Sequence, residues 1–500
     1  MGSNDTKMEL KPGDVVGGRY EIVGILGGGG FSVVFLTYDR QSRGAQALKT
    51  FLHQEGESDA ARRLFDRETA VWMGLGEHPF ILPARFAGEL DGRLFLATDF
   101  IAPDIRGCAR LLDHVRLGPV KTIHALTWAV QFCHGMEYAQ SKGLGCHCDI
   151  KPANIFITED GWVKIADFGF ARGVEEKAGA PKAEGAVADR MRGSIGFIAP
   201  EVFQGGQVSV RSDIYSLGVV LWQMAAHQPA FGVTFPGDWK VYAQQVRERQ
   251  LAGDVPHVDC PHWAQIERCL SVEAARRYGG FAELRAELED VLHREGGNVP
   301  AMPSSEEAKI SLLLNRASGL AHIGHHQEAI ETCDTILSTA PRHVTAWLRK
   351  GAALRRLKRS DEALACYDKA LEIDPQHAET WNSKGVALMR TERFEEALPC
   401  YDRSIELDPD SAWPWVNRGT CLCSLDRHEE AIDSYAKAIE KDRRLTPVWM
   451  SKGQAEEKAG RHSDAVKSYQ SLIKFSRQHE RPLRQRAREH LSRLASLGYY

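Results

Sequence analysis

The chain has 500 residues and a formal net charge of −4, with 43% hydrophobic and 26% charged residues. This is the composition of an ordinary globular protein with room for several domains, and it lacks the basic excess that binding to nucleic acid or to an anionic membrane surface requires. The most apolar run, residues 214–226, is interrupted by Tyr, Ser and Gln and is too short to span a bilayer. We therefore expect no nucleic-acid partner and no membrane span.

The 11 cysteines are scattered along the chain, and none of their spacings matches a zinc site. The amino-terminal sequence does not have the pattern of an export signal. An odd number of cysteines without such a signal indicates reduced thiols, so we expect a cytoplasmic protein.

Composition and periodicity predict five segments along the chain. Residues 1–14 form an N-terminal tail, and residues 15–295 mix β-rich runs with helical patterns. Residues 296–309 have the Gly, Pro and Ser composition of a linker. The remainder is helical: residues 310–479 are periodic, and residues 480–500 have the pattern of an amphipathic helix.

A glycine-rich run, LGGGGFSVV, lies near the start of the mixed segment at residues 26–34. Glycines allow backbone N–H groups to approach phosphate oxygens, although a plain β-turn would be the simpler interpretation of this run alone. Lys49 follows in the strand-like sequence AQALK, and its flexible ammonium needs a carboxylate to hold it in place. Glu68, on a predicted helix that ends before residue 78, is the candidate, with Asp66 as the alternative.

Two short motifs concentrate polar side chains in the middle of the same segment. Residues 147–154 have the sequence HCDIKPAN, and residues 167–169 have the sequence DFG. Carboxylate oxygens are hard ligands of the kind that Mg²⁺ prefers. An isolated DFG sequence arises easily by chance, but one placed shortly after such a loop does not.

Taken in this order, the motifs resemble those of Hanks-type (eukaryotic-like) serine/threonine protein kinases over residues 15–295. The resemblance implies an α+β bilobal protein kinase fold with ATP as the cofactor. Residues 94–101 resemble the strand that leads into the adenine-binding hinge, with a register fixed to within about one residue. The implied nucleotide-binding residues are Leu26, Gly27, Gly29, Val34, Ala47, Lys49, Thr98, Asp99 and Ile101.

The same resemblance implies chemical roles for the polar side chains. Asp149 would orient the substrate hydroxyl or accept its proton, and Lys151 would neutralise the γ-phosphate during transfer. Lys49 would bind the α- and β-phosphates while Glu68 holds its ammonium. A Lys two positions after the Asp resembles serine/threonine kinases and not tyrosine kinases. The implied ligands for Mg²⁺, or alternatively Mn²⁺, are Asn154 and Asp167.

The resemblance also implies structural supports. Glu201, in the APE sequence at residues 199–201, would pair with a buried Arg277, and Asp213 would hold the backbone around Asp149. The APE sequence and the segment before it form the platform that protein substrates use, which argues against a small-molecule kinase of the same broad fold. The presence of all the expected polar side chains argues against a pseudokinase scaffold that binds ATP without transferring phosphate.

The sequence departs from the family pattern beside Asp149, where Cys148 takes the place of the usual Arg. In relatives that keep this Arg, it faces a phosphorylated residue of the activation segment. Residues 170–193 contain no Ser, Thr or Tyr, and the first hydroxyl is Ser194, which is expected to contact the catalytic Asp and Lys. We therefore predict catalysis without activation-loop phosphorylation. The two cysteines beside His147 leave a redox or metal site open, but we favour a packing role for this His.

The carboxy-terminal segment repeats every 34 residues. Alanines and tyrosines keep this step, and so do tryptophans that are each followed four residues later by a glycine: Trp347 and Gly351, Trp381 and Gly385, Trp415 and Gly419, Trp449 and Gly453. The pattern resembles the tetratricopeptide repeat. It implies an all-α tetratricopeptide-repeat solenoid of five repeats over residues 310–479, closed by a capping helix at residues 480–500.

Solenoids of this family bind proteins or peptides in a concave groove. The residues expected to line it are mixed and fairly apolar, and they lack the Lys and Asn pattern of chaperone-binding repeats: Thr345, Leu348, Ala352, Arg355, Asn382, Val386, Met389, Trp413, Val416, Thr420 and Met450. Recruitment of protein substrates, self-association, docking onto the kinase domain and a simple spacer role are all open. Bacterial relatives combine such a kinase with a repeat tail, so we expect a bacterial origin.

Overall fold

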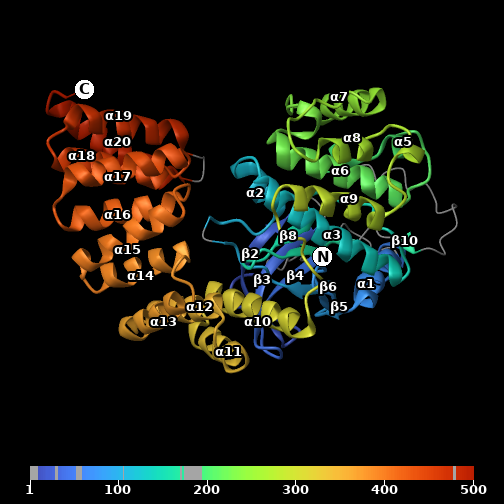
Figure 1. Cartoon of the computed structure of the whole chain (residues 1–500), viewed down its shortest axis with the longest axis horizontal. Coiled ribbons are helices and arrows are strands. Elements are labelled where there is room, and N and C mark those ends of the chain that lie inside the picture. The colour runs from blue at the N-terminus through green and yellow to red at the C-terminus, as the bar shows by residue number, and fades with distance from the viewer. Residues whose placement is uncertain are drawn as a thin grey trace, which may run out of the picture. The chain divides into compact units, whose positions relative to one another are not determined.

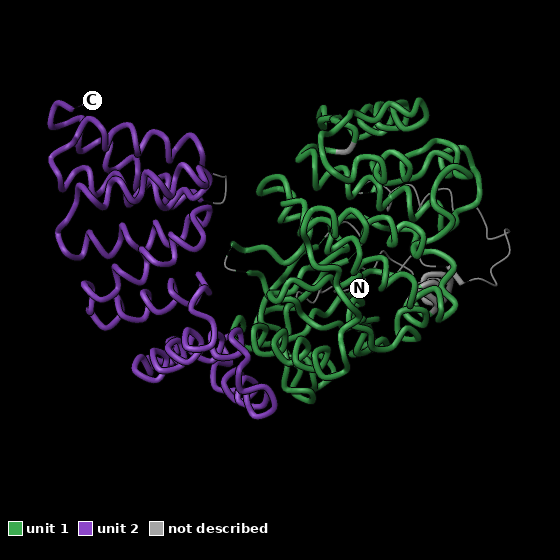
Figure 2. Tube along the Cα trace, viewed as in Figure 1, with its two compact units in different colours: residues 1–323 green, residues 324–500 purple. Residues whose placement is uncertain are grey.

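The computed structural model describes residues 10–28, 32–51, 59–104, 106–168, 172–173, 194–476 and 480–499. Within these ranges, the side chains of residues 51, 59–64, 67–68, 172–173 and 230 are also outside the description. The chain forms two compact units, residues 1–323 and residues 324–500, which we call the first and second units (Figure 2). Among the described helices, none is both long and apolar enough to cross a lipid bilayer.

The first unit begins with a six-stranded antiparallel sheet, in the order β1-β2-β3-β4-β6-β5. Alternation of apolar and polar residues buries one face, whose core includes Tyr20, Ile22, Phe35, Leu48 and Phe95. Helix α1 (Asp59–Leu75) follows β4 and packs against β5. The strands are β1 (Val15–Val16), β2 (Tyr20–Gly28), β3 (Ser32–Asp39), β4 (Gly44–Phe51), β5 (Ala84–Leu90) and β6 (Arg93–Asp99).

The rest of the first unit is mainly helical and surrounds two long, mostly apolar helices, as Figure 1 shows. Because α3 and α6 are apolar on nearly every side, both are buried in the largest hydrophobic core. The helices are α2 (Leu111–Leu117), α3 (Thr122–Ser141), α5 (Pro200–Phe203), α6 (Val210–Ala226), α7 (Trp239–Ala252), α8 (Trp263–Cys269) and α9 (Phe281–Arg294).

Four short strands and several single helical turns shape the loops between these helices. Strand β7 pairs with β10, and β8 pairs with β9, in two separate two-stranded antiparallel sheets. These strands are β7 (Leu144–Cys146), β8 (Ile155–Ile157), β9 (Val163–Ile165) and β10 (Arg172–Gly173). The 3-10 turns are η1 (Pro152–Asn154), η4 (Ile195–Phe197), η5 (Ala230–Gly232) and η6 (Ala274–Arg276).

Helix α10 (Ser305–His322) closes the first unit and packs against strand β4 of the sheet (Figure 1). It starts with a capping box in which Ser304 and Glu307 each bond the other's backbone N–H. A Cβ on Gly319 would lie only 3.1 Å from the Ala45 Cβ, so the missing side chain permits this close approach. The helix begins within the predicted linker and contains the start of the predicted repeats, so the compact units divide at residue 323 and not at residue 310.

The second unit is a series of antiparallel helix pairs with the same internal packing. In the pair α14–α15, a Cβ placed on Gly385 would lie 2.6 Å from Cε1 of Tyr401, so this glycine admits the tyrosine ring. Gly351, Gly419 and Gly453 meet Tyr367, Tyr435 and Tyr469 in the same way. The helices are α11 (His326–Thr339), α12 (Val344–Arg356), α13 (Ser360–Ile373), α14 (Ala378–Arg390), α15 (Phe394–Leu407), α16 (Ala412–Ser424), α17 (His428–Lys441), α18 (Thr446–Lys458), α19 (His462–Phe475) and α20 (Arg481–Ser496).

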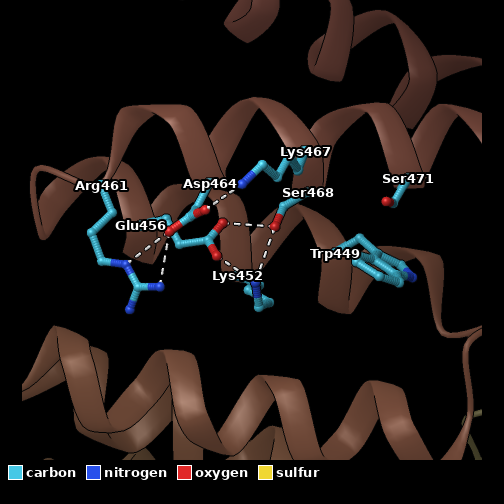
Figure 3. Close-up of a pocket in the computed structure, with 8 residues that line it drawn as sticks. All are labelled: Trp449, Lys452, Glu456, Arg461, Asp464, Lys467, Ser468 and Ser471. Carbon is cyan, nitrogen blue, oxygen red and sulfur yellow. Dashed lines mark hydrogen bonds and ion pairs between the residues drawn. The ribbon is translucent and has the colours of Figure 1, made fainter. Parts of the chain in front are cut away.

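An ion pair recurs between a helix and the helix before it. Its lengths are 2.6, 2.7 and 2.7 Å in successive positions: Lys350–Asp334, Lys384–Asp368 and Arg418–Asp402. The fourth basic residue, Lys452, has Ala436 at the position where the acid would stand. It instead pairs with the fully buried Glu456, whose carboxylate also accepts a hydrogen bond from Ser468 Oγ at 2.6 Å (Figure 3). Leucine occupies the place of Glu456 in the preceding helices: Leu354, Leu388 and Leu422.

The last helix, α20, covers the end of the helix series. Its apolar side packs on α19 through the buried residues Ala487 and Leu494. Glu457 accepts a hydrogen bond from Tyr469 Oη at 2.6 Å and lies 2.8 Å from His490 Nδ1 of α20.

Elsewhere in the repeats, the predicted groove lining is wrong for Leu348 and Met450, because both side chains are buried.

Candidate active site

The backbone around Asp149 is held by one buried carboxylate. Asp213, at the start of α6, accepts the N–H of His147 on Oδ2 at 2.6 Å and the N–H of Cys148 on Oδ1 at 2.9 Å. Burial raises the pKa of Asp213 to about 7, although these two N–H groups oppose the shift. Cys148 turns the chain with a φ of 66°, so the loop bends directly before Asp149. The predicted supporting role of Asp213 is confirmed by these contacts.

Asp149, Lys151 and Ser194 form a closed set of hydrogen bonds. Lys151 Nζ lies 3.0 and 2.7 Å from the two carboxylate oxygens of Asp149 and 2.9 Å from Ser194 Oγ. Ser194 Oγ donates to Asp149 Oδ1 at 2.7 Å. The Ser194 contact with the Asp and the Lys was predicted from the sequence and is present. A carboxylate, an ammonium and a hydroxyl are therefore fixed together at the end of the loop.

Asn154 and Asp167 lie beside this set. Asn154 Nδ2 donates to the Asp149 backbone carbonyl at 3.0 Å and to Asp149 Oδ2 at 2.8 Å. Asp167 Oδ1 accepts a hydrogen bond from Lys49 Nζ at 3.1 Å. Burial acts to raise the pKa of Asp167, but the ammonium of Lys49 outweighs it, so the pKa lies below its usual range. Asp167 is therefore a carboxylate at neutral pH.

His147 is a packing residue, as the sequence predicted. Its Nε2 lies 3.2 Å from the Ala166 carbonyl oxygen, its Nδ1 accepts the Asp149 N–H at 3.3 Å, and its ring packs on Phe168. Burial lowers the pKa of this His, so its neutral form is favoured. The Phe168 ring also contacts Trp72 of α1. Phe168 is thus held between His147 of the loop and Trp72 of α1.

The register of the sheet brings most of the predicted nucleotide-binding residues into neighbouring rows. Val34 of β3 stands opposite Gly27 of β2 on one side and Lys49 of β4 on the other. Ala47 of β4 stands opposite Thr98 of β6. The remaining predicted positions flank these rows, except for Gly29, which lies outside the described residues: Leu26, Asp99 and Ile101.

The predicted ion pair of Lys49 with Glu68 falls on a side chain outside the described residues. The helix that carries Glu68, α1, is present at the predicted place. The alternative partner, Asp66, is exposed on the same helix. The described part of the site therefore leaves the carboxylate partner of Lys49 on α1 as a prediction.

Sequence reasoning missed an ion pair at the end of strand β6. Arg85 of β5 holds both carboxylate oxygens of Asp99, with Nε and Nη2 each at 2.8 Å. The contact with Asp99 raises the pKa of this Arg above its usual value. No motif marks Arg85, and only the pairing of β5 with β6 could have indicated that the two side chains meet. The pair fixes the end of the strand from which the predicted hinge starts.

The supporting pair beneath the site is also present. Arg277 donates to Glu201 Oε1 at 3.0 Å and to Oε2 at 2.9 Å, and its side chain is completely buried. Burial acts to raise the pKa of Glu201, but the hydrogen bonds from Arg277 and Ser212 outweigh it, and the pKa lies below its usual range. The APE segment is therefore tied to the helical part of the first unit by a charged, bidentate contact.

Comparison of the chain with known protein families identifies the family to which it belongs. The protein kinase domain model matches residues 20–342, which is more than half of the chain, so the chain belongs to the protein kinase family. Tetratricopeptide repeat models match residues 344–377, 378–411 and 400–433. The matches confirm the bilobal kinase fold and the helical repeats predicted from the sequence.

Individual relatives point to bacterial serine/threonine kinases. The chain is 29% identical over 306 residues to the serine/threonine-protein kinase PknB of Mycobacterium tuberculosis, which covers 61% of this chain and 47% of that protein. It is 30% identical over 299 residues to PknB of Mycolicibacterium smegmatis, which covers 58% of this chain and 45% of that protein. The chain thus spans about half the length of these curated relatives.

Proposed function

We propose that the chain is a serine/threonine protein kinase that transfers the γ-phosphate of ATP to hydroxyl groups of proteins. The observation that carries the proposal is the closed set of Asp149, Lys151 and Ser194, with contacts of 2.7 to 3.0 Å. The match to the protein kinase domain model covers this part of the chain, and the similarity to the serine/threonine-protein kinase PknB supports the same class of reaction.

Each charged side chain has a distinct role in this proposal. Asp149 orients the incoming hydroxyl and accepts its proton, while Lys151 offsets the negative charge of the transferring phosphoryl group. Lys49, paired with Glu68 of α1, binds the α- and β-phosphates. The nucleotide lies along the rows of β2, β3, β4 and β6, with its base at the segment after Thr98. Positioning and charge compensation are the main contributions that a protein makes to phosphoryl transfer.

Asp167 and Asn154 are the proposed ligands of Mg²⁺, and Mn²⁺ is the alternative metal. The donor set fits a hard cation, because Asp167 is ionised and Asn154 uses its amide nitrogen, not its oxygen, to bond Asp149. The metal supplies charge neutralisation for the phosphates of the nucleotide. Lys49 beside Asp167 keeps that carboxylate deprotonated and therefore available as a ligand.

We further propose that the kinase is active without phosphorylation of its activation segment. Cys148 stands where an Arg would need an anionic partner, and residues 170–193 offer no hydroxyl to phosphorylate. The hydroxyl that follows, Ser194, already donates to Asp149 and accepts from Lys151. The catalytic side chains are held by one another, so no added phosphate is needed to position them.

The repeats are proposed to bind protein partners, either as substrates or as regulators. The recurring ion pairs and glycine–tyrosine contacts leave a regular helix array, which is the type of surface that recognises peptides. A chain that ends at Ile323 keeps the whole first unit and tests this role. It should phosphorylate a short model peptide at the rate of the full chain but lose selectivity among proteins. Equal selectivity of both chains would contradict a recruiting role.

The decisive experiment for the enzyme proposal is transfer of ³²P from labelled ATP with Mg²⁺, using the full chain after phosphatase treatment. The wild type is expected to label itself or a protein substrate. Asp149→Asn is expected to lose at least about 1,000-fold in rate, because both orientation and proton transfer are removed, while still binding nucleotide. Asp259→Asn, which alters an exposed carboxylate, is the matched control. Nucleotide binding without transfer by the wild type would favour a pseudokinase.

A further inference from the structure

Two thiols flank His147 and lie in contact. The Sγ atoms of Cys146 and Cys148 are 2.9 Å apart, closer than unbonded sulfur atoms normally approach. A disulfide requires about 2.05 Å, so a small movement would join them. Cys146 is buried, whereas Cys148 is partly exposed and open to a small reagent. Neither thiol has a place in the phosphate transfer proposed above.

The backbone holds both cysteines in this position. Cys146 ends β7 and is paired with Arg172 of β10. Cys148 has its N–H bound to Asp213 and its φ at 66°, which turns its side chain back towards Cys146. Because both attachment points are fixed by other contacts, the sulfur atoms stay close without a covalent bond. Thiols that are held together in this way form a disulfide more readily than thiols that must first meet.

We propose that Cys146 and Cys148 form a reversible disulfide when the protein meets a peroxide, and that this bond switches the kinase off. In the first step the Cys148 thiolate attacks one peroxide oxygen, the O–O bond breaks, and hydroxide leaves to give a sulfenic acid and, after protonation, water. In the second step the Cys146 thiolate attacks the Cys148 sulfur and displaces hydroxide, which is protonated to water. Two thiols and one hydrogen peroxide thus give one disulfide and two waters.

The bond would close a small ring that contains His147 and ends directly before Asp149. Such a ring changes the backbone angles at Cys148, and the N–H groups of His147 and Cys148 can no longer both meet Asp213 as they do now. Asp149 then moves relative to Lys151 and Ser194, which hold it in the reduced protein. The position that holds a phosphate-sensing Arg in the family resemblance would here hold a peroxide-sensing thiol. The effect on activity rests on the proposed function, but formation of the bond does not.

The test uses the full chain, treated with hydrogen peroxide and then alkylated and digested without a reductant. The peptide that contains residues 146–148 is expected to lose two hydrogen atoms in mass and to resist alkylation, and dithiothreitol should reverse both changes. Cys260, which is half-buried elsewhere, should be alkylated in both samples as an internal control. Stepwise oxygen addition at Cys148, with Cys146 still open to alkylation, would overturn the proposed site.

Activity is compared as the ratio of treated to untreated rate within each variant. The wild type is expected to fall on the order of 100-fold, the loss that about 1 Å of misplacement of a catalytic group causes, and to recover with dithiothreitol. Cys146→Ser cannot form the bond and should keep its untreated rate within about twofold, whereas Cys260→Ser should fall and recover as the wild type does. A mapped disulfide with an unchanged rate would overturn the switch. If the reduced protein transfers no phosphate at all, the proposed function fails, and the mass result alone then decides the thiol site.

Discussion

Asn315 of α10 donates a hydrogen bond from its side-chain amide to the backbone carbonyl of Phe100 at 3.0 Å. Phe100 lies between Asp99 and Ile101, in the segment that the proposed kinase uses to bind adenine. Arg316, the next residue of the helix, donates to the backbone carbonyl of Ser42 at 2.7 Å, just before β4. A helix that the sequence assigned to the repeats is therefore bonded to the segments directly before β4 and directly after β6.

The Asn315 contact predicts a local effect on stability. Asn315→Ala removes the donor to a partly buried carbonyl, which costs about 1 kcal/mol. Backbone amides of α10 should then exchange their hydrogens about fivefold faster, because the helix opens more often. Lys309→Ala, an exposed change on the same helix, is the control and should leave the exchange rates within twofold. Equal exchange in both variants would show that the amide contact contributes nothing.

Neighbouring arginines give a matched test of the buried ion pair. Arg277→Ala leaves the partly buried carboxylate of Glu201 without its partner and should destabilise the first unit by about 3 kcal/mol. Arg276, the preceding residue, forms an exposed pair with Glu273. Arg276→Ala should therefore cost less than about 1 kcal/mol. Urea unfolding of the two variants makes the comparison, and similar midpoints would contradict the assignment.

The contact between Gly385 and Tyr401 predicts that Gly385→Ala changes stability in opposite directions with and without the tyrosine ring. Gly385→Ala places a Cβ 2.6 Å from the tyrosine ring, so it should destabilise the second unit by about 1–3 kcal/mol. In a Tyr401→Ala background the obstruction is gone. There the same change should stabilise by up to about 1 kcal/mol, because alanine favours a helix more than glycine does. Thermal unfolding of the wild type, the two single variants and the double variant measures these effects. An effect of the same sign in both backgrounds would contradict the explanation.

Glu456 offers a test of how the repeat pattern is altered near the end of the series. Glu456→Leu restores the leucine found in the preceding helices but removes the partner of Lys452, and should cost about 1–2 kcal/mol. Adding Ala436→Asp supplies the acid that pairs with the basic residue in the preceding helices. The double variant should be at least as stable as the wild type, since an ion pair buried in a core contributes little net stability. A double variant no better than Glu456→Leu would show that the pattern is not transferable.

Asp213 predicts a dependence of stability on pH. Its pKa is about 7 in the folded chain and about 4 in an unfolded one, so the folded state holds the proton more tightly. The stabilising effect of that proton is complete below pH 4 and is lost as the pH rises towards 7. The free energy of unfolding of the wild type should thus fall over this window, by up to about 4 kcal/mol, relative to Asp213→Asn. Denaturation curves from pH 4.5 to 7.5 measure the difference, and parallel profiles would contradict it.

The contacts that the sequence predicted well are those fixed by a motif. The Glu201–Arg277 pair, the support of the loop by Asp213 and the position of Ser194 all follow from residues that stand next to a recognisable pattern. The repeat helices follow from a strict period, since a glycine and a tyrosine in register can meet in only one way. These features depend on local spacing, which is visible in a linear sequence.

The features that were missed depend on which surfaces meet. Periodicity identifies one side of a helix but not what covers it, so Leu348 was expected in a groove and is buried instead. Nothing in the sequence of α10 marks Asn315 as a partner of Phe100, because the two residues are more than 200 positions apart. Arg85 and Asp99 meet only because β5 and β6 pair in one register. The Lys49–Glu68 pair stays a prediction.

The contacts between successive helix pairs of the second unit follow one repeated pattern. The ion pair that links one helix pair to the pair before it recurs as Lys350–Asp334, Lys384–Asp368 and Arg418–Asp402, so these internal repeats can follow one another without a new interface. Duplication or loss of a 34-residue stretch of the gene would therefore change the reach of the tail while leaving these contacts intact. The same does not hold for the last helix pair, α18–α19. There Glu456 stands in place of the repeated leucine, and α20 covers the end of the helix series.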